Sequence, residues 1–261
     1  MSVAIELAAV GKHFARAGDA GGDYVALNGF TLEVEEGEFF CLLGPTGCGK
    51  STVLHLVAGF ERPSAGSVRV FGAAVEKPDA DRGVVFQTEQ ALFPWLTVEE
   101  NVSFGLRMRG IALAERNAVL DRNLELVGLP RHRTKFPREL SGGMKQRVQI
   151  ARALANDPRI LLMDEPFGAL DAQTRRRMQE EVARIWSATG KTVIFITHDI
   201  GEAIWLADRV GVMTRGPAAR LKEIVKVDLP RPRHAMTEVY VELYNRLSAT
   251  IQAEAEAMLN D

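Results

Sequence analysis

The sequence lacks the features that define several large classes of protein. It contains only two cysteines, Cys41 and Cys48, in 261 residues. Two cysteines this close in sequence cannot build the disulfide framework of a small secreted protein, so we expect a reducing compartment. The N-terminus has no signal-like stretch. The apolar runs, such as residues 160–163 and 192–197, fall far short of the ~20 apolar residues that a membrane-spanning helix needs. We therefore expect a soluble protein, and any membrane that it meets belongs to a partner.

An excess of charge of one sign is also missing. The chain has 32 Lys and Arg against 34 Asp and Glu residues, which gives a formal net charge of −2, and the basic residues are scattered. Proteins that bind nucleic acid usually concentrate positive charge on one face, so we expect no nucleic-acid partner. Apolar residues make up 46% of the chain. That fraction and the length allow one large α/β domain or one domain with a sizeable insertion.

A glycine-rich segment directly follows the apolar run at residues 39–43. The segment consists of Gly44, Pro45, Thr46, Gly47, Cys48, Gly49, Lys50, Ser51 and Thr52. Its glycines allow backbone N–H groups to turn toward an anion, and the helix that should follow offers its free amides to the same phosphates. Lys50 can then reach the β- and γ-phosphates, and Ser51 can offer its hydroxyl to Mg²⁺. A turn with an incidental Lys-Ser pair is the alternative, but the strand and helix context favours a site for ATP or GTP.

A second pattern is an apolar strand that ends in two acids. Residues 160–163 are apolar and lead into Asp164 and Glu165. An Asp at this position can hold Mg²⁺ opposite the hydroxyl of the phosphate loop. The backbone beyond the strand can turn Glu165 toward the nucleotide, where a carboxylate can accept a proton from the attacking water. The alternative is an acidic surface turn before Pro166.

A third pattern opens a helix at Ser141, Gly142 and Gly143, whose backbone amides offer a second anion site. Alone, this pattern is an ordinary helix cap. Because it stands between the phosphate loop and the acidic strand, we expect it to complete the nucleotide site of a neighbouring copy.

The order of expected strands and helices along the chain predicts the fold class. The N-terminal part reads as strands with Gly, Asp and Pro in its turns, and a helical texture replaces it from Thr97, a helix cap followed by Glu99 and Glu100. Strands return at residues 159–163, 192–197 and 209–214 with helical segments between them. This alternation predicts an α/β protein with a mostly parallel sheet, an antiparallel β segment at the N-terminus and an inserted helical lobe.

With these motifs in this order, nearly the whole chain resembles the ATP-binding cassette (ABC) family. The resemblance implies a P-loop NTPase (RecA-like) core at residues 1–89 and 157–230, a helical signature-motif subdomain at 90–156 and a C-terminal helical extension at 231–261. Residues 140–147 resemble the family's signature motif, although Met144 stands where the signature often has Gln. The implied cofactors are ATP and Mg²⁺.

The resemblance also assigns four single residues, and each has a structural alternative. Gln87 resembles the glutamine that touches Mg²⁺ and the attacking water, and its alternative is a solvated loop amide. His198 resembles the histidine that contacts the γ-phosphate, and its alternative is a polar surface residue. Phe14 resembles the aromatic that stacks on adenine, although it could be core packing and His13 beside it could hold that place. Asp171, with residues 169–170, resembles the loop that crosses to the partner subunit.

The end of the chain indicates the branch of the family. Residues 216–218 and 227–233 resemble the ATPase subunits of nitrate, sulfonate and taurine importers. We therefore expect an ATPase that forms a homodimer through its nucleotide sites, binds membrane permease subunits at the inner, cytoplasmic face of the cell membrane and serves a solute-binding protein indirectly. Residues 91–96 could form a groove for a permease helix or could belong to the core. The alternative functions are an ATPase of an exporter or of a soluble machine, and a nucleotide sensor that does not hydrolyse its nucleotide.

Cys48 lies inside the phosphate loop beside Lys50 and a helix N-terminus. These neighbours lower the pKa of a thiol, so Cys48, if exposed, should react with maleimide, and Mg-ATP should protect it. The structural alternative is a small spacer between two glycines.

Overall fold

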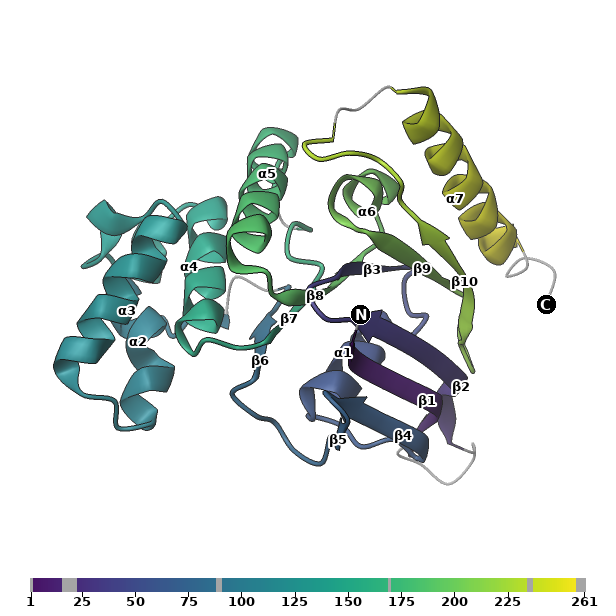
Figure 1. Cartoon of the computed structure of the whole chain (residues 1–261), viewed down its shortest axis with the longest axis horizontal. Helices are drawn as coiled ribbons and strands as arrows, with labels where there is room; N and C mark the ends of the chain where they lie inside the picture. The colour runs from purple at the N-terminus through teal and green to yellow at the C-terminus, as the bar shows by residue number, and fades with distance from the viewer. Residues whose placement is uncertain (1, 16–22, 88–90, 169, 234–236, 257–261) are drawn as a thin grey trace. The chain divides into compact units, whose positions relative to one another are not determined.

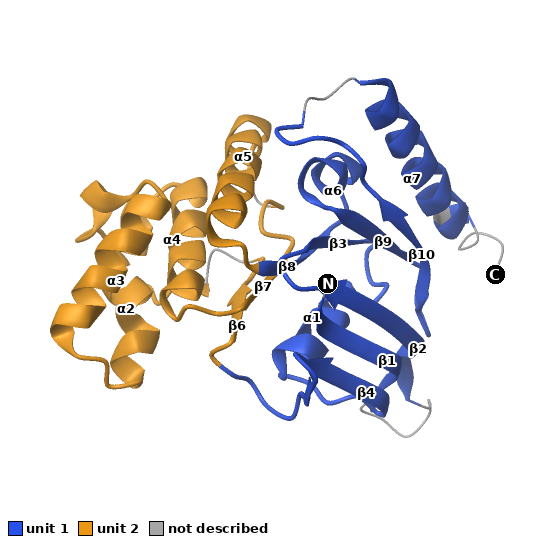
Figure 2. Ribbon diagram, viewed as in Figure 1, with its two compact units in different colours: residues 1–79, 192–261 blue, residues 80–191 orange. Residues whose placement is uncertain are grey.

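The computed structural model describes residues 2–15, 23–87, 91–168, 170–233 and 237–256 (Figure 1). The chain packs as two compact units (Figure 2). Unit 1 comprises residues 1–79 and 192–261, and unit 2 comprises residues 80–191. The boundaries at residues 90 and 157, which rest on motifs rather than on packing, remain predictions. In the part of the chain that is described, no helix is long and apolar enough to cross a membrane.

Unit 1 contains the antiparallel sheet that the N-terminal pattern predicts. Its strands are β1 (Val3–Phe14), β2 (Tyr24–Glu35), β4 (Ala65–Val70) and β5 (Ala73–Ala74), in the order β2-β1-β4-β5. β1 runs beyond the expected strand at residues 3–10. The register shifts between Leu7 and Val10, where Ala9 has a φ of +48°. The bulge explains why the apolar pattern breaks there while the strand continues.

A second group of strands in unit 1 forms the core of the nucleotide-binding region. These strands are β10 (Leu221–Lys226), β9 (Arg209–Met213), β3 (Phe39–Leu43) and β8 (Thr192–Thr197), in this order. β3 is parallel to both β8 and β9, whereas β10 is antiparallel to β9. Every residue of β3 and β8 is buried, as expected for parallel strands covered on both faces. β10 was not predicted, because an edge strand carries charges that hide its apolar pattern.

Three helices pack on unit 1. They are α1 (Lys50–Ala58), α6 (Ile200–Leu206) and α7 (Glu238–Glu256). α6 buries Ala203, Ile204 and Leu206, so the apolar face expected between residues 199 and 209 belongs to the core. α7 packs against α6 and β9 and buries Leu247 completely. It leaves Val239 and Tyr244 exposed.

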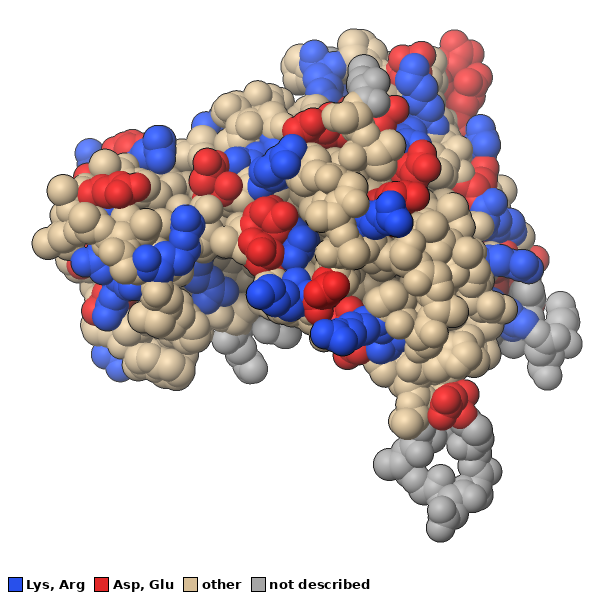
Figure 3. All heavy atoms as spheres, turned by 60° about the horizontal axis from the view of Figure 1, so that its bottom comes forward, with Lys and Arg blue, Asp and Glu red and all other residues tan. Residues whose placement is uncertain are grey.

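Unit 2 combines a strand pair with a helical lobe. β6 (Arg82–Val85) and β7 (Ile160–Asp164) are parallel. The helices are α2 (Val98–Met108), α3 (Leu113–Leu126), α4 (Gly142–Ala155) and α5 (Ala172–Thr189), with short 3₁₀ turns at Pro130–His132 and Pro137–Glu139. The Thr97 hydroxyl accepts from the Glu100 amide and the Glu100 carboxylate accepts from the Thr97 amide, which confirms the predicted helix start. Acidic and basic side chains are interspersed over the face seen in Figure 3, in keeping with the balanced composition.

Candidate nucleotide site

The phosphate loop connects β3 to α1 in unit 1. Gly47 and Gly49 have φ values of +79° and +93°, which lie in the left-handed region that favours glycine. Gly49 is the N-cap of α1, and no side chain caps this helix end. The first amides of α1 are therefore free to bind an anion together with the positive end of the helix dipole.

Close packing inside the loop explains Gly44 and corrects one expectation. A Cβ atom on Gly44 would lie only 2.9 Å from Cys48 Sγ and 3.2 Å from Met213 Cβ, so a larger residue has no room. Cys48 itself is 1% exposed. The expectation of an exposed, reactive thiol is therefore wrong. The thiol fills the interior of the loop, 4.0 Å from Lys50 Nζ, instead of facing solvent.

The donor set of the loop fits a polyphosphate. Lys50 is 5% exposed, and its Nζ donates to the carbonyl oxygens of Gly44 at 2.8 Å and Pro45 at 3.0 Å. Both of these partners are neutral carbonyls, which places the amino group where it can donate to a nearby anion. Ser51 is exposed in the first turn of α1, where its hydroxyl is accessible to a metal ion. Ammonium, hydroxyl and amides are the groups that a nucleoside triphosphate with Mg²⁺ requires.

His198 and the phosphate loop leave the same edge of unit 1. β3 and β8 are parallel, and Leu43 pairs with Thr197. Because both strands end in register, Gly44 and His198 begin at the same level. His198 is exposed, whereas the six residues of β8 before it are all buried. This placement agrees with a histidine that faces a ligand at the carboxyl ends of parallel strands.

Unit 2 brings Gln87 and Glu165 together. β6 and β7 are parallel, and Val85 pairs with Met163, so Gln87 and Glu165 both follow the carboxyl ends of their strands. Gln87 Nε2 donates to Glu165 Oε2 at 3.3 Å. Glu165 has a φ of +40°, a strained conformation for a residue with a side chain. Asp164, at the end of β7, is partly exposed.

The helix start at Ser141 lies beside that of Asp171. Ser141 Oγ accepts a hydrogen bond from the Met144 amide at 3.4 Å, so Ser141 acts as a cap in this chain. A Cβ atom on Gly143 would approach Thr174 Cγ2 to 2.7 Å, which means that the contact between α4 and α5 requires glycine. Asp171 caps α5 and accepts from the Gln173 and Thr174 amides at 3.1 and 3.0 Å.

The bonds from Thr174 hold the pKa of Asp171 below its ordinary value, so this carboxylate is charged at neutral pH. Ala169, part of the same expected loop, lies outside the described residues.

Phe14 lies at the end of β1 and is partly exposed. The ammonium of Lys12 lies 4.7 Å from the centroid of its ring. That ammonium is held by Glu61 at 2.7 Å and by the Arg62 carbonyl at 3.0 Å. Phe14 therefore already contacts a cation from within unit 1, and stacking on adenine stays a prediction. His13 is exposed.

Two features of the site were not predicted from the sequence. Gly168 lies close to Gln87 and Glu165, because a Cβ atom there would lie 3.5 Å from the Glu165 carbonyl oxygen and 3.7 Å from Gln87 Nε2. Glu202 is 5% exposed and accepts a 2.6 Å hydrogen bond from Thr197, next to His198. The sequence could have indicated Glu202 as an acid that follows the end of a strand, but only after the end of β8 had been located.

Comparison with known proteins assigns the family. A family model described as "ABC transporter" matches residues 27–168. The chain is 48% identical over 221 residues to the nitrate import ATP-binding protein NrtD of Synechococcus elongatus, covering 83% of this chain and 80% of that protein. It is 45% identical over 253 residues to the bicarbonate transport ATP-binding protein CmpC of the same organism, covering 96% of this chain but 38% of that longer protein.

A solved structure has a similar fold. It is the dimeric post-hydrolysis state of the ATP-binding cassette MJ0796 bound to ADP and Pi, with a TM-score of 0.72 and 31% identity over 85% of this chain and 98% of that chain.

These similarities confirm a P-loop NTPase fold and an ATPase whose cofactors are ATP and Mg²⁺. The chain belongs to the ABC transporter family. Within that family it is the ATPase of an importer.

Proposed function

We propose that this chain hydrolyses ATP to energise uptake of a small solute, of the nitrate, sulfonate or taurine kind, through separate membrane subunits. The observation that carries the proposal is the similarity to NrtD along four fifths of both chains. The similarity to CmpC, named for bicarbonate, also indicates a small anion. An exporter or a sensor without turnover has no comparable support.

The site residues divide the chemistry between them. The phosphate loop and Lys50 bind the triphosphate, Ser51, Gln87 and Asp164 provide oxygen ligands for Mg²⁺, and His198 contacts the γ-phosphate. Mg²⁺, when bound, neutralises charge on the β- and γ-phosphates. In the part of the chain that is described, no three His, Cys, Asp or Glu side chains form a metal cluster. Mg²⁺ fits such a site, because it commonly takes one or two carboxylates and completes its shell with phosphate oxygens and water.

Glu165 is the general base. Its carboxylate accepts the proton of the attacking water, and Gln87, bonded to Glu165 Oε2 at 3.3 Å, orients both. The positive φ of Glu165 directs the carboxylate away from the strand direction. Phe14 stacks on the adenine with the ring face that Lys12 leaves free.

The chain works as a homodimer. The amides of Gly142 and Gly143, together with Ser141 and Asp171, complete the nucleotide site of the second copy. The proposal is supported by the dimeric state named for the related cassette with ADP and Pi. It also explains why a glycine-rich helix start recurs in a chain that already has a phosphate loop.

An aromatic patch, formed by Phe93, Trp95 and Phe104, provides the permease contact. The ring of Phe93 lies 5.6 Å from that of Trp95 and 4.6 Å from that of Phe104, and Trp95 is 70% exposed. Leu92, which directly precedes Phe93, is 3% exposed and belongs to the core, so residues 91–96 divide between the two expected roles. An exposed tryptophan that is backed by two partly buried aromatic rings fits a helix of the membrane subunits, which holds the chain at the inner, cytoplasmic face of the membrane.

Transport assays in the host test the proposal. Deletion of the chain should abolish uptake of one solute among labelled nitrate, taurine, methanesulfonate and bicarbonate. The parent gene should restore that uptake, and a matched Glu165→Gln gene should not. Unchanged uptake of all four solutes would overturn the proposed substrate class.

A further inference from the structure

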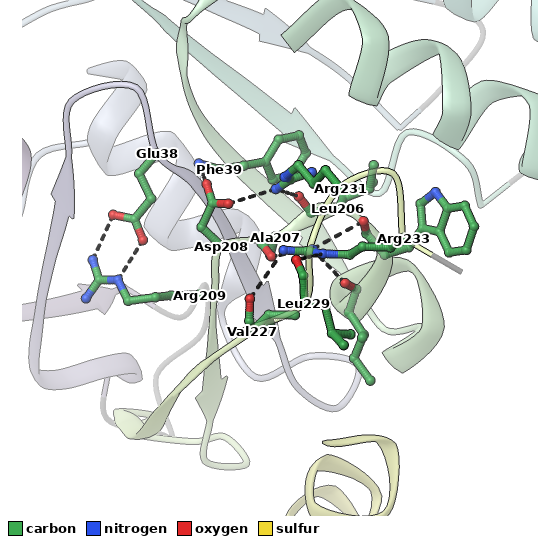
Figure 4. A network of polar contacts seen from close by, with 12 residues as sticks. Glu38, Phe39, Leu206, Ala207, Asp208, Arg209, Val227, Leu229, Arg231 and Arg233 are labelled. Carbon is green, nitrogen blue, oxygen red and sulfur yellow. Dashed lines mark hydrogen bonds and ion pairs between the residues drawn. The ribbon is translucent and has the colours of Figure 1, made fainter. Parts of the chain in front are cut away.

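Arg233 is a buried arginine in the segment between β10 and α7. It is 5% exposed, and its guanidinium lies against the C-terminal end of α6 (Figure 4). Nη1 donates to the carbonyl oxygens of Ala207 at 2.6 Å and Ile204 at 2.7 Å, with a longer contact of 3.3 Å to Trp205. These are carbonyls that the end of a helix leaves without partners inside the helix. Arg233 therefore acts as a cap on α6 that comes from a distant part of the chain.

The same guanidinium also holds its own segment in place. Nε donates to the carbonyl oxygen of Leu229 at 3.3 Å, and Nη2 donates to the carbonyl oxygen of Val227 at 3.4 Å. Burial lowers the pKa of Arg233 to about 10, so the guanidinium stays charged at neutral pH although it is removed from water. The negative end of the α6 dipole offsets part of this desolvation cost. A charge buried in this way needs its carbonyl partners in fixed positions.

Arg231 extends the contact, through Asp208, to the start of β3. Its Nη2 donates to the Leu206 carbonyl at 2.5 Å and to Asp208 Oδ1 at 2.8 Å. The second oxygen of Asp208 accepts from the Phe39 amide at 2.9 Å (Figure 4). Phe39 is the first residue of β3, so the segment at residues 227–233 is bonded to both the end of α6 and the start of the strand that carries the phosphate loop.

The other end of α6 positions His198. Thr197 Oγ1 donates to Glu202 Oε2 at 2.6 Å and accepts from the Asp199 amide at 3.0 Å. Asp199 caps α6 by accepting from the Glu202 amide at 3.0 Å. Both neighbours of His198 are thus bonded to Glu202. Any shift or rotation of α6 moves Glu202 and with it the backbone of His198.

α7 contacts this second end. A Cβ atom on Gly201 would lie 3.4 Å from Tyr240 Oη, which places the tyrosine against the first turn of α6. Burial, with a smaller contribution from Asp199, raises the pKa of Tyr240. The C-terminal segment therefore holds α6 at both ends, through Arg233 at one and Tyr240 at the other.

We propose that Arg233 is a positioning residue for ATP hydrolysis, which fixes α6 and thereby holds His198 at the γ-phosphate. The inference rests on the role proposed above for His198. The proposal means that the C-terminal extension, residues 231–261, influences ATP hydrolysis through α6 and His198. Arg233 contacts backbone carbonyl oxygens at the end of α6 and in its own segment, so we expect its effect in turnover and not in nucleotide affinity.

Kinetics of the full-length chain test the inference. Arg233→Met keeps the length and apolar stem of the side chain but leaves the α6 carbonyls unbonded. We expect kcat to fall by about tenfold or more, as for a misplaced catalytic group, while the KM for ATP changes less than about twofold. Arg233→Lys retains one donor group and should recover part of kcat. The control is Arg246→Met, which removes an ion pair between α7 and Glu223 but no contact with α6, and should keep parental kcat.

A double-mutant cycle separates positioning from general damage. In a His198→Ala background, Arg233→Met should change the residual kcat less than about twofold, because the group that it positions is already gone. Parental kcat in Arg233→Met, or the same loss of kcat with and without His198, would overturn the inference. Parental kcat in His198→Ala alone would instead show that the proposed role of His198 is wrong.

Discussion

Gln87 Nε2 donates to Glu165 Oε2 at 3.3 Å, from a loop after β6 to a turn after the neighbouring parallel strand β7. One carboxylate oxygen of Glu165 is thereby oriented by an amide that cannot itself take a proton. This contact supports the proposal that Glu165 is the base and that Gln87 orients it.

The first prediction concerns Glu165 as the base. Glu165→Gln keeps the shape of the side chain and removes its ability to accept a proton at neutral pH. Hydrolysis should slow by at least about 10²-fold, while ATP and Mg²⁺ binding persist and ATP holds the dimer closed. Phosphate release and gel filtration with ATP measure the two effects. Near-parental turnover in this variant would exclude Glu165 as the base.

The second prediction separates the two helix starts that can bind phosphate. Lys50→Ala removes the buried ammonium of the phosphate loop and should abolish nucleotide binding by the monomer. Ser141→Arg places a bulky cation at the start of α4 and should leave monomer binding intact but prevent ATP-dependent dimerisation. Binding is measured with a fluorescent ATP analogue and dimerisation by light scattering. Loss of monomer binding in Ser141→Arg contradicts a site completed by the second copy.

Residues with strong local patterns were predicted correctly from the sequence. The strands at 39–43 and 192–197 and the cap at Thr97 agree with the structure, because burial on both faces and capping chemistry leave local signals. β10 and the buried Arg233 were missed. Their environment comes from segments far away in the sequence, and an edge strand or an arginine that directly follows a proline looks solvent-exposed when read locally.

In the nucleotide site, too, the features with a local sequence signal were predicted and those that depend on distant segments were not. The order of the motifs predicted which residues approach the carboxyl ends of the strands, and Gln87 and Glu165 do meet. The burial of Cys48 was not predicted. It depends on the close approach of Met213 to Gly44, a contact between β9 and the phosphate loop that no local pattern records.

The third prediction follows from that burial. Cys41 and Cys48 are both buried, and desolvation raises the pKa of Cys41 well above its ordinary value. Neither thiol should react with maleimide in the native protein near pH 7, because the thiolate is the reactive form and access is blocked. Both should react in denaturant, and Cys48→Ser should retain parental ATPase activity. Stoichiometric labelling of the native chain without loss of structure would contradict the closed packing of the loop.

The fourth prediction tests the aromatic patch. Trp95→Ala should leave the ATPase activity of the isolated chain unchanged and should reduce solute uptake in cells at least about tenfold, because truncating a tryptophan that is a hot spot of an interface costs about 2 kcal/mol or more of binding energy. The matched control is Phe60→Ala, another exposed aromatic, which lies in unit 1. Uptake should be unaffected in the control. If both variants transport at the parental rate, Trp95 does not contact the permease.

The fifth prediction concerns the attachment of α7 to β10. Glu223 Oε1 accepts from Thr250 Oγ1 at 2.6 Å, and Glu223 Oε2 pairs with Arg246 at 2.7 Å. The bond from Thr250, followed by the arginine, lowers the pKa of Glu223 below 4.5. A lowered pKa means that the carboxylate stabilises the folded state above the pKa of the unfolded chain, and that this contribution is lost as the pH falls through the folded pKa.

Glu223→Gln should therefore lower the free energy of unfolding at pH 7 by about 0.5 kcal/mol, the size expected for a largely exposed pair. The difference from the parent should shrink as the pH falls below 4.5, where the parent also loses its charge. Urea titrations of both proteins at several pH values measure this convergence. Glu242→Gln, at an exposed position on α7, serves as the control and should leave the free energy of unfolding nearly unchanged at each pH. A difference between Glu223→Gln and parent that stays constant down to pH values at which both remain folded would mean that Glu223 contributes through hydrogen bonding alone, without its charge.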